Sequence, residues 1–200
     1  MKLYYAPASC ALAPHIAAIE AGVPLDLVKV DLRAHETEAG EDYYAINPRG
    51  YVPLLELDDG TRMTESSVLV QLIADKNPGA NLLPASGIER YKVQSWLAFI
   101  STELHKGFGP LWDPTSPDET KASARKKLAT RFEELERVLG RQQYIAGSTF
   151  TVADAYGFTV TNWTRFHNID LAPYPNIQAW MTRVGQRPKV IEAMKQEGLM

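Results

Sequence analysis

The segment YVPLLELDDGTRMTESS, residues 51–67, contains the clearest fold signal in this sequence. Two runs with strand character, residues 51–57 and 61–64, flank the turn Asp58-Asp59-Gly60. An Asp-Gly pair between two such runs is typical of a β-hairpin, so these strands should be antiparallel. From Glu65 onward, apolar residues recur at helical spacing until Asn77-Pro78-Gly79, which predicts that a helix follows the hairpin.

The residues before this segment predict a strand–helix–strand unit. Leu3-Tyr4-Tyr5 favours a strand, residues 12–19 carry apolar side chains at helical spacing before Gly22, and residues 26–32 form a second strand-like run. A unit of this length favours a right-handed parallel crossover. After a polar connection over residues 35–42, the hairpin and helix complete a thioredoxin-like α/β domain with a mixed four-stranded sheet.

The second half of the chain predicts an all-helical domain. Residues 78–87 contain two prolines and two glycines, a composition that suits a linker. We therefore expect an α/β domain over residues 1–78, a linker over 79–87 and a helical domain over 88–200. The apolar periodicity predicts helices over about 88–108, 118–139, 151–167, 176–184 and 188–197.

Composition excludes several classes of protein. The 200 residues are 45% hydrophobic and 22% charged, with a formal net charge of -3. These values are typical of a globular chain, and no basic field of the kind that binds nucleic acid or anionic membranes is present. The N-terminus lacks the apolar core of a signal peptide, and no run is long enough to span a bilayer. We expect a cytoplasmic protein.

Thr151 and Asp154 form a helix start signal. The run Phe150-Thr-Val-Ala-Asp154 puts a hydroxyl at the N-cap and an acid three residues later, where each can satisfy an unpaired backbone amide. We therefore interpret Asp154 as structural. His15 and His167 have no neighbours at metal-ligand spacing, so we assign both to structure and expect no metal.

Cys10 is the only cysteine, which rules out an internal disulfide, a C-x-x-C pair and a cysteine-built zinc site. It follows a strand and a proline-containing turn and lies near the predicted start of the first helix. There, free amides and the helix dipole would lower the pKa of the thiol. The alternative is a small buried apolar residue, and position alone leaves the two interpretations open.

Two other features point to a ligand. A proline within a strand, as in Val52-Pro53, indicates a cis peptide or an edge position; a cis bond would expose the backbone of Val52 to an extended peptide ligand. A helix starting near Glu65 would direct amides and the Ser66 hydroxyl toward an anion such as a carboxylate, while Glu65 accepts from an ammonium. A plain helix cap by Thr64 or Ser66 explains the same residues structurally.

The order and spacing of several motifs resemble the glutathione transferase superfamily, most closely its bacterial β class, over nearly the whole chain. The matching motifs are Met1-Lys-Leu-Tyr-Tyr with Cys10 shortly after, Asn47-Pro-Arg-Gly50 before Val52-Pro53, Leu57-Asp-Asp-Gly60, Thr64-Glu65-Ser66, Glu103-Leu-His-Lys-Gly-Phe108 and Phe150-Thr-Val-Ala-Asp154.

The resemblance implies that the N-terminal domain binds glutathione as co-substrate. Val52, before the cis Pro53, would pair with the cysteinyl backbone of glutathione, and Glu65 and Ser66 would hold its γ-glutamyl end. Cys10 would lie beside the glutathione sulfur, with which it can form a mixed disulfide.

The resemblance also implies functions for the helix that follows the linker. His105 and Lys106 would reach the glutathione site, although the helical pattern alone indicates solvated residues. Thr102 and Glu103 would contact the glutathione of a neighbouring subunit in a homodimer. Two positions depart from some β-class members, since His35 replaces a lysine and Ala98 an asparagine. A neutral imidazole is a weaker substitute for lysine near neutral pH.

These expectations describe an enzyme that directs the glutathione thiolate at a small hydrophobic electrophile, with Cys10, His105 and Lys106 as the catalytic candidates. One alternative is thiol–disulfide or peroxidase chemistry at Cys10 itself; Tyr5 or Ser9 would then be the hydroxyls to test for conjugation. Another is a non-catalytic ligand-binding or scaffold protein of the same fold. The electrophile pocket stays open, because four aromatic residues could line it or belong to the core: Phe108, Trp112, Trp163 and Phe166.

Overall fold

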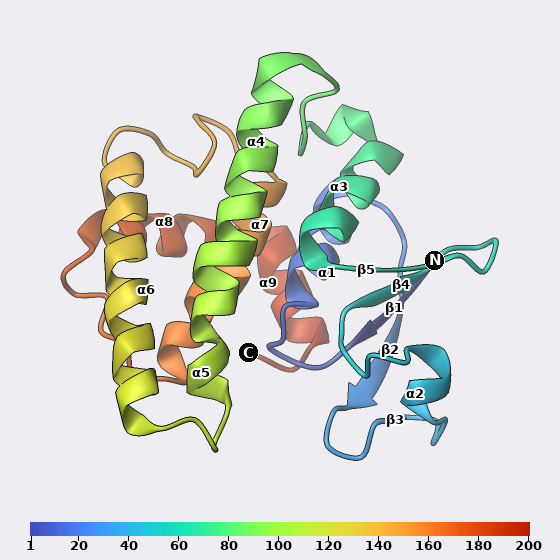
Figure 1. The fold of residues 1–200 in the computed structure, drawn as a ribbon. Helices are drawn as coiled ribbons and strands as arrows, with labels where there is room; N and C mark the ends of the chain where they lie inside the picture. Colours follow the sequence, from blue (N-terminus) through green and yellow to red (C-terminus); the bar gives the residue numbers. More distant parts are fainter. The chain divides into compact units, whose positions relative to one another are not determined.

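The computed structural model describes residues 1–200 and divides them into two compact units (Figure 1). The first unit contains Met1–Leu83 together with Arg187–Met200, and the second contains Pro84–Gln186. The boundary near residue 83 lies inside the linker expected over residues 79–87. The last fourteen residues differ from expectation, because they pack with the first unit and not with the helical one.

The first unit is built on a mixed sheet whose order is β3-β2-β1-β4-β5. β1 pairs with β2 in parallel, as the strand–helix–strand pattern predicts, and the other neighbours are antiparallel. The expected four-stranded sheet has a fifth strand, β3, which is only two residues long. The strands are β1 (Lys2–Tyr5), β2 (Asp26–Asp31), β3 (Glu36–Thr37), β4 (Leu54–Glu56) and β5 (Arg62–Thr64).

Three helices of this unit pack together beside the sheet. α1 spans Leu12–Ala21, α3 spans Ser66–Lys76, and α9 spans Pro188–Gln196. α1 contacts both α3 and α9. α1 ends at Gly22, whose φ of 67° lies in the left-handed region that glycine adopts without strain. A short helix, α2 (Tyr43–Ile46), and a turn, η1 (Pro78–Ala80), complete the unit.

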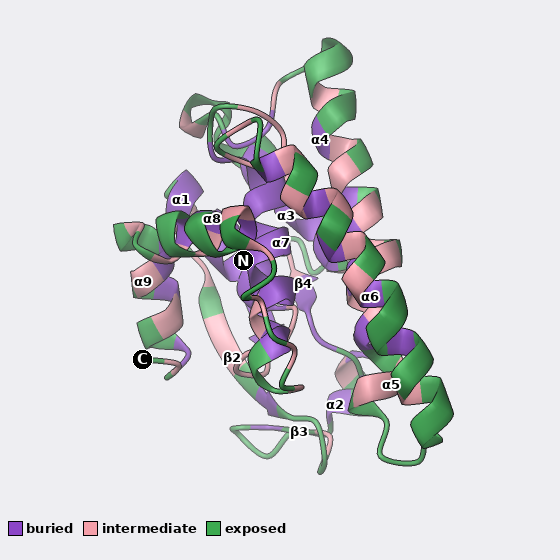
Figure 2. Ribbon diagram, turned by 90° about the vertical axis from the view of Figure 1, so that its left-hand side faces the viewer, coloured by how far each residue is buried: buried purple, intermediate pink, exposed green.

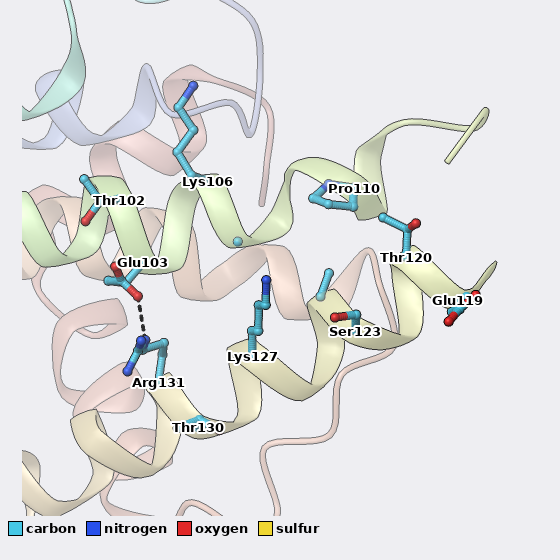
Figure 3. Close-up of a pocket in the computed structure, with 12 residues that line it drawn as sticks. Thr102, Glu103, Lys106, Pro110, Glu119, Thr120, Ser123, Lys127, Thr130 and Arg131 are labelled. Carbon is cyan, nitrogen blue, oxygen red and sulfur yellow. Dashed lines mark hydrogen bonds and ion pairs between the residues drawn. The ribbon is translucent and has the colours of Figure 1, made fainter. Parts of the chain in front are cut away.

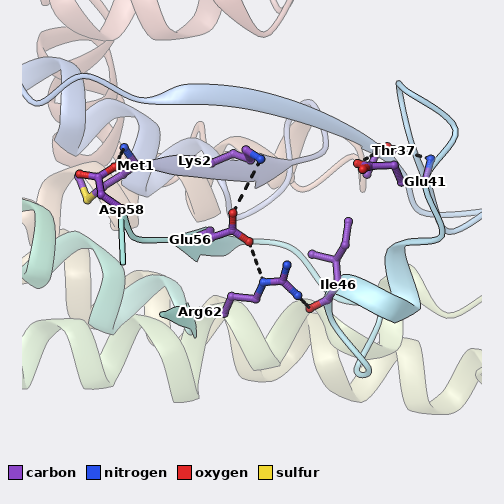
Figure 4. Close-up of polar contacts among 8 residues, drawn as sticks. All are labelled: Met1, Lys2, Thr37, Glu41, Ile46, Glu56, Asp58 and Arg62. Atoms are coloured by element: carbon purple, nitrogen blue, oxygen red, sulfur yellow. Dashed lines mark hydrogen bonds and ion pairs between the residues drawn. The ribbon is translucent and has the colours of Figure 1, made fainter. Parts of the chain in front are cut away.

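A chain of charged side chains ties three strands of the sheet together (Figure 4). Glu56 on β4 receives Lys2 from β1 at 3.8 Å and Arg62 from β5 at 2.7 Å. Arg62 also donates to the carbonyl of Ile46 at 3.0 Å. The strand pairing places these residues directly opposite one another, so unlike charges oppose across both strand pairs.

The second unit is helical. Its central helix, α7 (Val152–Thr161), is buried along its whole length (Figure 2). The capping box of Thr151 and Asp154 is confirmed. None of the helices combines the length and the apolar character that a membrane span requires. The other elements are α4 (Gly87–Phe99), η2 (Ile100–His105), η3 (Lys106–Phe108), α5 (Gly109–Trp112), α6 (Asp118–Leu139), η4 (Asn162–Arg165) and α8 (Pro175–Gly185).

Candidate functional site

The loop before α1 holds Cys10 against two other predicted site residues. The Ser66 hydroxyl donates to the Cys10 carbonyl at 3.1 Å, and the Cys10 thiol donates to the Val52 carbonyl at 3.4 Å. Val52 and Ser66 lie 42 and 56 positions after Cys10 in the sequence. The fold thus gathers at one point three residues that were singled out separately.

The expectation of a lowered thiol pKa is wrong in this structure. Burial raises the pKa of Cys10 to about 11, and Glu65 acts in the same direction more weakly. α1 begins only at Leu12, so Cys10 precedes the helical turn whose amides would have favoured a thiolate. The thiol therefore stays protonated at neutral pH and acts as a hydrogen-bond donor.

The peptide bond between Val52 and Pro53 is cis, the first of the two alternatives that a proline in a strand-like run left open. The backbone just before it is anchored, because the Tyr51 carbonyl accepts from the Tyr43 hydroxyl at 2.8 Å and from the Asn47 amide at 2.6 Å. The expected freedom of the Val52 backbone holds only in part. The Val52 carbonyl already accepts a hydrogen bond from the Cys10 thiol, so a peptide ligand would share this carbonyl with Cys10.

Glu65 occupies the N-cap position of α3 without a side-chain cap. Its φ of 72° is in the left-handed region, which is rare for a residue other than glycine, asparagine or aspartate. Such outliers cluster at functional sites. Its carboxylate is mostly exposed and lies 3.7 Å from Arg49. Capping by Thr64 or Ser66 is therefore wrong for this helix: the Ser66 hydroxyl bonds to Cys10 instead.

His35 contacts a different part of the first unit. Its ring stacks on Tyr44 with centroids 4.3 Å apart, and its Nδ1 is enclosed without a hydrogen-bond partner. The close turn at Gly50 has a φ of 66°, and a Cβ there would lie 3.0 Å from the His35 ring. None of these contacts joins His35 to Cys10, Val52 or Ser66.

In the second unit, α4 continues into a π-helical turn, η2, that carries His105. The Lys106 amide bonds to the Ser101 carbonyl, five residues earlier. Single π-helical turns are rare overall, and those that occur are often found at functional sites. The sequence predicted an uninterrupted α-helix here, since a π turn leaves no clear mark on apolar periodicity.

His105 lies in an aromatic setting that keeps it neutral. Its Nδ1 is 2.6 Å from the Tyr156 hydroxyl, and its ring meets the Trp163 ring edge-on with centroids 4.8 Å apart. Burial lowers the pKa of His105 to about 4, and the charge on Lys106 adds to this. The imidazole therefore has one N–H at neutral pH and carries no positive charge.

Lys106, Thr102 and Glu103 lie along a groove between the η2 and η3 turns and α6 (Figure 3). Lys106 is exposed, whereas Glu103 is held by Arg131 of α6 at 2.6 Å. The Thr102 hydroxyl bonds to the Ala98 carbonyl of its own helix at 3.0 Å. The groove has a volume of about 730 Å³, and its remaining walls come from Gly107, Pro110, Glu119, Thr120, Ser123, Ala124, Lys127, Thr130 and Arg131.

The four aromatic candidates for an electrophile pocket divide into two kinds. Phe108 and Trp163 are buried core residues, whereas Trp112 is 48% exposed and Phe166 is 56% exposed. Trp112 and Phe166 have ring centroids 5.9 Å apart. The structure adds His167, whose ring centroid lies 4.2 Å from that of Trp112. Nothing in the sequence pattern pointed to this last contact.

A thioredoxin-like unit with a cis proline beside a cysteine loop, in one chain with a helical unit, defines a class of glutathione-dependent enzymes. The sequence profiles of the glutathione S-transferase N-terminal and C-terminal domains match residues 8–76 and 99–188. The chain is 44% identical to glutathione S-transferase GstA of Escherichia coli O157:H7, and the alignment covers both chains completely. The chain belongs to the glutathione S-transferase family.

Solved structures agree with this assignment. The structure of a sphingomonad glutathione S-transferase complexed with glutathione is 43% identical, with a TM-score of 0.96 and full coverage of both chains. The bacterial β-class glutathione S-transferase of Sphingomonas chungbukensis gives the same identity, coverage and TM-score. Within the family, the chain is most like the β class.

Two residues of the site were not predicted. Tyr156 bonds to His105, and Glu197 accepts from the Ala8 amide in the loop before Cys10 at 3.2 Å. Tyr156 lies in the buried helix α7, for which the sequence predicted a helix and no bond to His105. Glu197 lies near the C-terminus, 189 positions from Ala8, so no local pattern could have joined them.

Proposed function

We propose that this protein binds glutathione and joins it, through its sulfur, to a small hydrophobic electrophile. The observation that carries the proposal is the meeting of Cys10, the Val52 carbonyl and the Ser66 hydroxyl at one point of the thioredoxin-like unit. A relative of the same fold was solved in complex with glutathione. The reaction needs reduced glutathione, the principal thiol of the cytoplasm.

Each chain segment of the proposed site would bind one part of glutathione. The backbone of Val52 would pair with the cysteinyl unit, in the manner of a strand added to a sheet edge. Glu65 and Ser66 at the start of α3 would hold the ammonium and carboxylate of the γ-glutamyl end, since free amides at a helix start favour an anion. His35 is the candidate for the glycine end, where it would be a weak donor.

The reaction exchanges one bond at an electrophilic carbon. With a chloronitrobenzene, the glutathione thiol first loses its proton to solvent. The thiolate sulfur then forms a bond to the ring carbon that carries chlorine, and the carbon–chlorine bond breaks with its electron pair, which leaves as chloride. The protein accelerates this step by favouring the thiolate and by holding the two reactants together.

Cys10 would serve as a donor to that sulfur. A thiol with a pKa of about 11 is almost wholly protonated at neutral pH, and only a thiolate attacks disulfides. This favours conjugation over the alternative in which Cys10 is itself the nucleophile. Burial also raises the pKa of the Tyr5 hydroxyl, so this group too stays protonated at neutral pH.

His105 and Lys106 would stabilise the thiolate in different ways. The neutral imidazole can donate one hydrogen bond to sulfur, and the exposed ammonium of Lys106 supplies positive charge. The exposed faces of Trp112 and Phe166 would receive a flat aromatic electrophile, because aromatic rings stack favourably on one another.

We also propose that the protein is a homodimer. Thr102 and Glu103 lie on the open groove beside α6, where a second copy would bring its glutathione. The pairing of Glu103 with Arg131 fixes the carboxylate in that groove.

Steady-state conjugation of glutathione to 1-chloro-2,4-dinitrobenzene tests the proposal. We expect turnover above the uncatalysed rate, with losses of about tenfold or more in His105→Phe and in Ser66→Ala. Tyr91→Phe, at an exposed position in α4, is the matched control and should keep full activity. No turnover with any electrophile, combined with disulfide reduction that disappears in Cys10→Ala, would favour the redox alternative.

A further inference from the structure

The direction of the hydrogen bond between Tyr156 and His105 is coupled to which ring nitrogen of the histidine carries the proton. Both residues belong to the helical unit, and the phenol of Tyr156 is almost completely buried, at 2% exposure. The two atoms are 2.6 Å apart. Hydroxyl donors make shorter bonds than N–H donors: O–H···O bonds measure about 2.5–3.0 Å and N–H···O bonds about 2.7–3.2 Å. A separation at the short end of these ranges is in keeping with a phenol that donates to an unprotonated Nδ1.

The acidity and basicity of the two groups also favour donation from the Tyr156 phenol to Nδ1 of His105. A neutral imidazole has one donor nitrogen and one acceptor nitrogen. The unprotonated nitrogen is the strongest base in the pair, and the phenol proton is the more acidic of the two available protons. When Nδ1 accepts from Tyr156, the single imidazole proton must reside on Nε2.

Nε2 is the nitrogen that a ligand can reach. It makes no hydrogen bond within the chain, and it is not fully enclosed, in contrast to three other side-chain atoms that lack a partner. Those enclosed atoms are His35 Nδ1, Thr161 Oγ1 and His167 Nε2. The open position of His105 is thus a donor site with a defined direction, held by the ring contacts of Trp163 and Tyr156.

We infer that Tyr156 is a positioning residue that holds His105 in the Nε2–H tautomer, so that His105 acts as a hydrogen-bond donor and not as a general base. The catalytic consequence rests on the proposed function: the donor would stabilise a glutathione thiolate, and the thiol proton would leave to solvent. The tautomer itself is a property of the free protein.

Nitrogen-15 NMR of the intact protein near neutral pH tests the tautomer directly. We expect a pyridine-type shift at Nδ1 of His105 and a pyrrole-type shift at Nε2. In Tyr156→Phe, which removes one oxygen and keeps the ring, the preference should weaken. Protonated Nδ1, or two pyrrole-type shifts, in the unmutated protein would overturn the inference.

Kinetics test whether the tautomer matters for turnover. Tyr156→Phe should lower kcat by about tenfold, the loss expected for one well-placed hydrogen bond, with a smaller effect on KM. The same change in a His105→Phe background should have no further effect. A further loss in that background would show that Tyr156 acts on packing and not through His105. Tyr174→Phe, which removes a phenol that bonds to the Ala129 carbonyl in the same unit, is the matched control.

Separate measurements test the function of His105 and its tautomer. If His105→Phe turns over at the full rate, the proposed function of His105 is wrong, while the NMR result still decides the tautomer. If His105→Phe is impaired and the tautomer is reversed, conjugation stands and this inference is wrong.

Discussion

The carboxylate of Glu197 pairs with Nδ1 of His15 at 3.0 Å, although the two residues are 182 positions apart. Both side chains are buried. The second ring nitrogen of His15 faces the Gln196 amide oxygen at 2.8 Å, and the second carboxylate oxygen of Glu197 receives the Ala8 amide. This cluster fastens the end of α9 to α1 and to the loop that carries Cys10.

Glu197→Ala should strongly destabilise the protein. Loss of the carboxylate leaves Nδ1 of the buried His15 and the Ala8 amide without their partner, and each unsatisfied buried polar group costs about 1–3 kcal/mol. Urea denaturation would measure the change in the free energy of unfolding. Lys195→Ala, at an exposed position of α9, should change it by less than about 0.5 kcal/mol. Equal effects of the two changes would mean that the cluster does not fasten α9.

Cys10 should react slowly with iodoacetamide at neutral pH. Because its pKa is about 11, the thiolate fraction is very small at pH 7 and the rate should still be rising above pH 10. Mass spectrometry of the intact protein would follow the modification, since Cys10 is the only cysteine. A rate that levels off below pH 8 would show an activated thiol.

His105 should make the protein less stable as the pH falls. Its pKa is about 6.5 in the unfolded chain and about 4 in the folded one, so protonation favours the unfolded state. Its contribution is fully present above pH 6.5 and is lost as the pH falls toward 4, by up to about 3 kcal/mol.

Denaturation curves from pH 7 to pH 4 would measure this loss, with His105→Phe for comparison. The variant should show a shallower decline over that range. Identical slopes for the two proteins would mean that His105 titrates normally when folded.

Gly157→Ala should destabilise the helical unit. A Cβ at this position of α7 would lie 2.5 Å from Ile145 Cδ1, with Trp180 and Ile100 also in contact. Overpacking of this kind costs about 1–3 kcal/mol.

Gly185→Ala provides the contrast, because a Cβ there would meet Phe158 at an ordinary 3.5 Å. It should leave stability unchanged or raise it by up to about 1 kcal/mol. Thermal unfolding of both variants is the measurement. A Gly157→Ala protein as stable as Gly185→Ala would contradict the packing described for α7.

The elements with strong local signals were predicted well. The Asp-Asp-Gly turn marked the antiparallel pair β4 and β5, and α6 spans the expected residues 118–139. β3, α2 and α5 were missed because they have only two, four and four residues, too few to show a period. The π turn at residues 100–105 was missed because it shifts the helix without changing its composition.

The sequence identified residues that meet in the site, but it did not predict their pKa values or their hydrogen-bond partners. Motif spacing selected Cys10, Val52 and Ser66, which the fold brings together. The direction of the Cys10 pKa shift was wrong, because it depends on burial and on the exact start of α1. The partners of His105 and His15 depend on contacts between distant segments, which no local pattern reveals.

The most direct test of the central claim is mass spectrometry of the product and the protein from one quenched reaction with glutathione and 1-chloro-2,4-dinitrobenzene. We predict a dinitrophenyl thioether of glutathione, formed faster than without protein, and a protein whose Cys10 is unmodified during turnover. Product formation at the uncatalysed rate, or a protein that accumulates glutathione or the aryl group on Cys10 as an intermediate, would contradict the account.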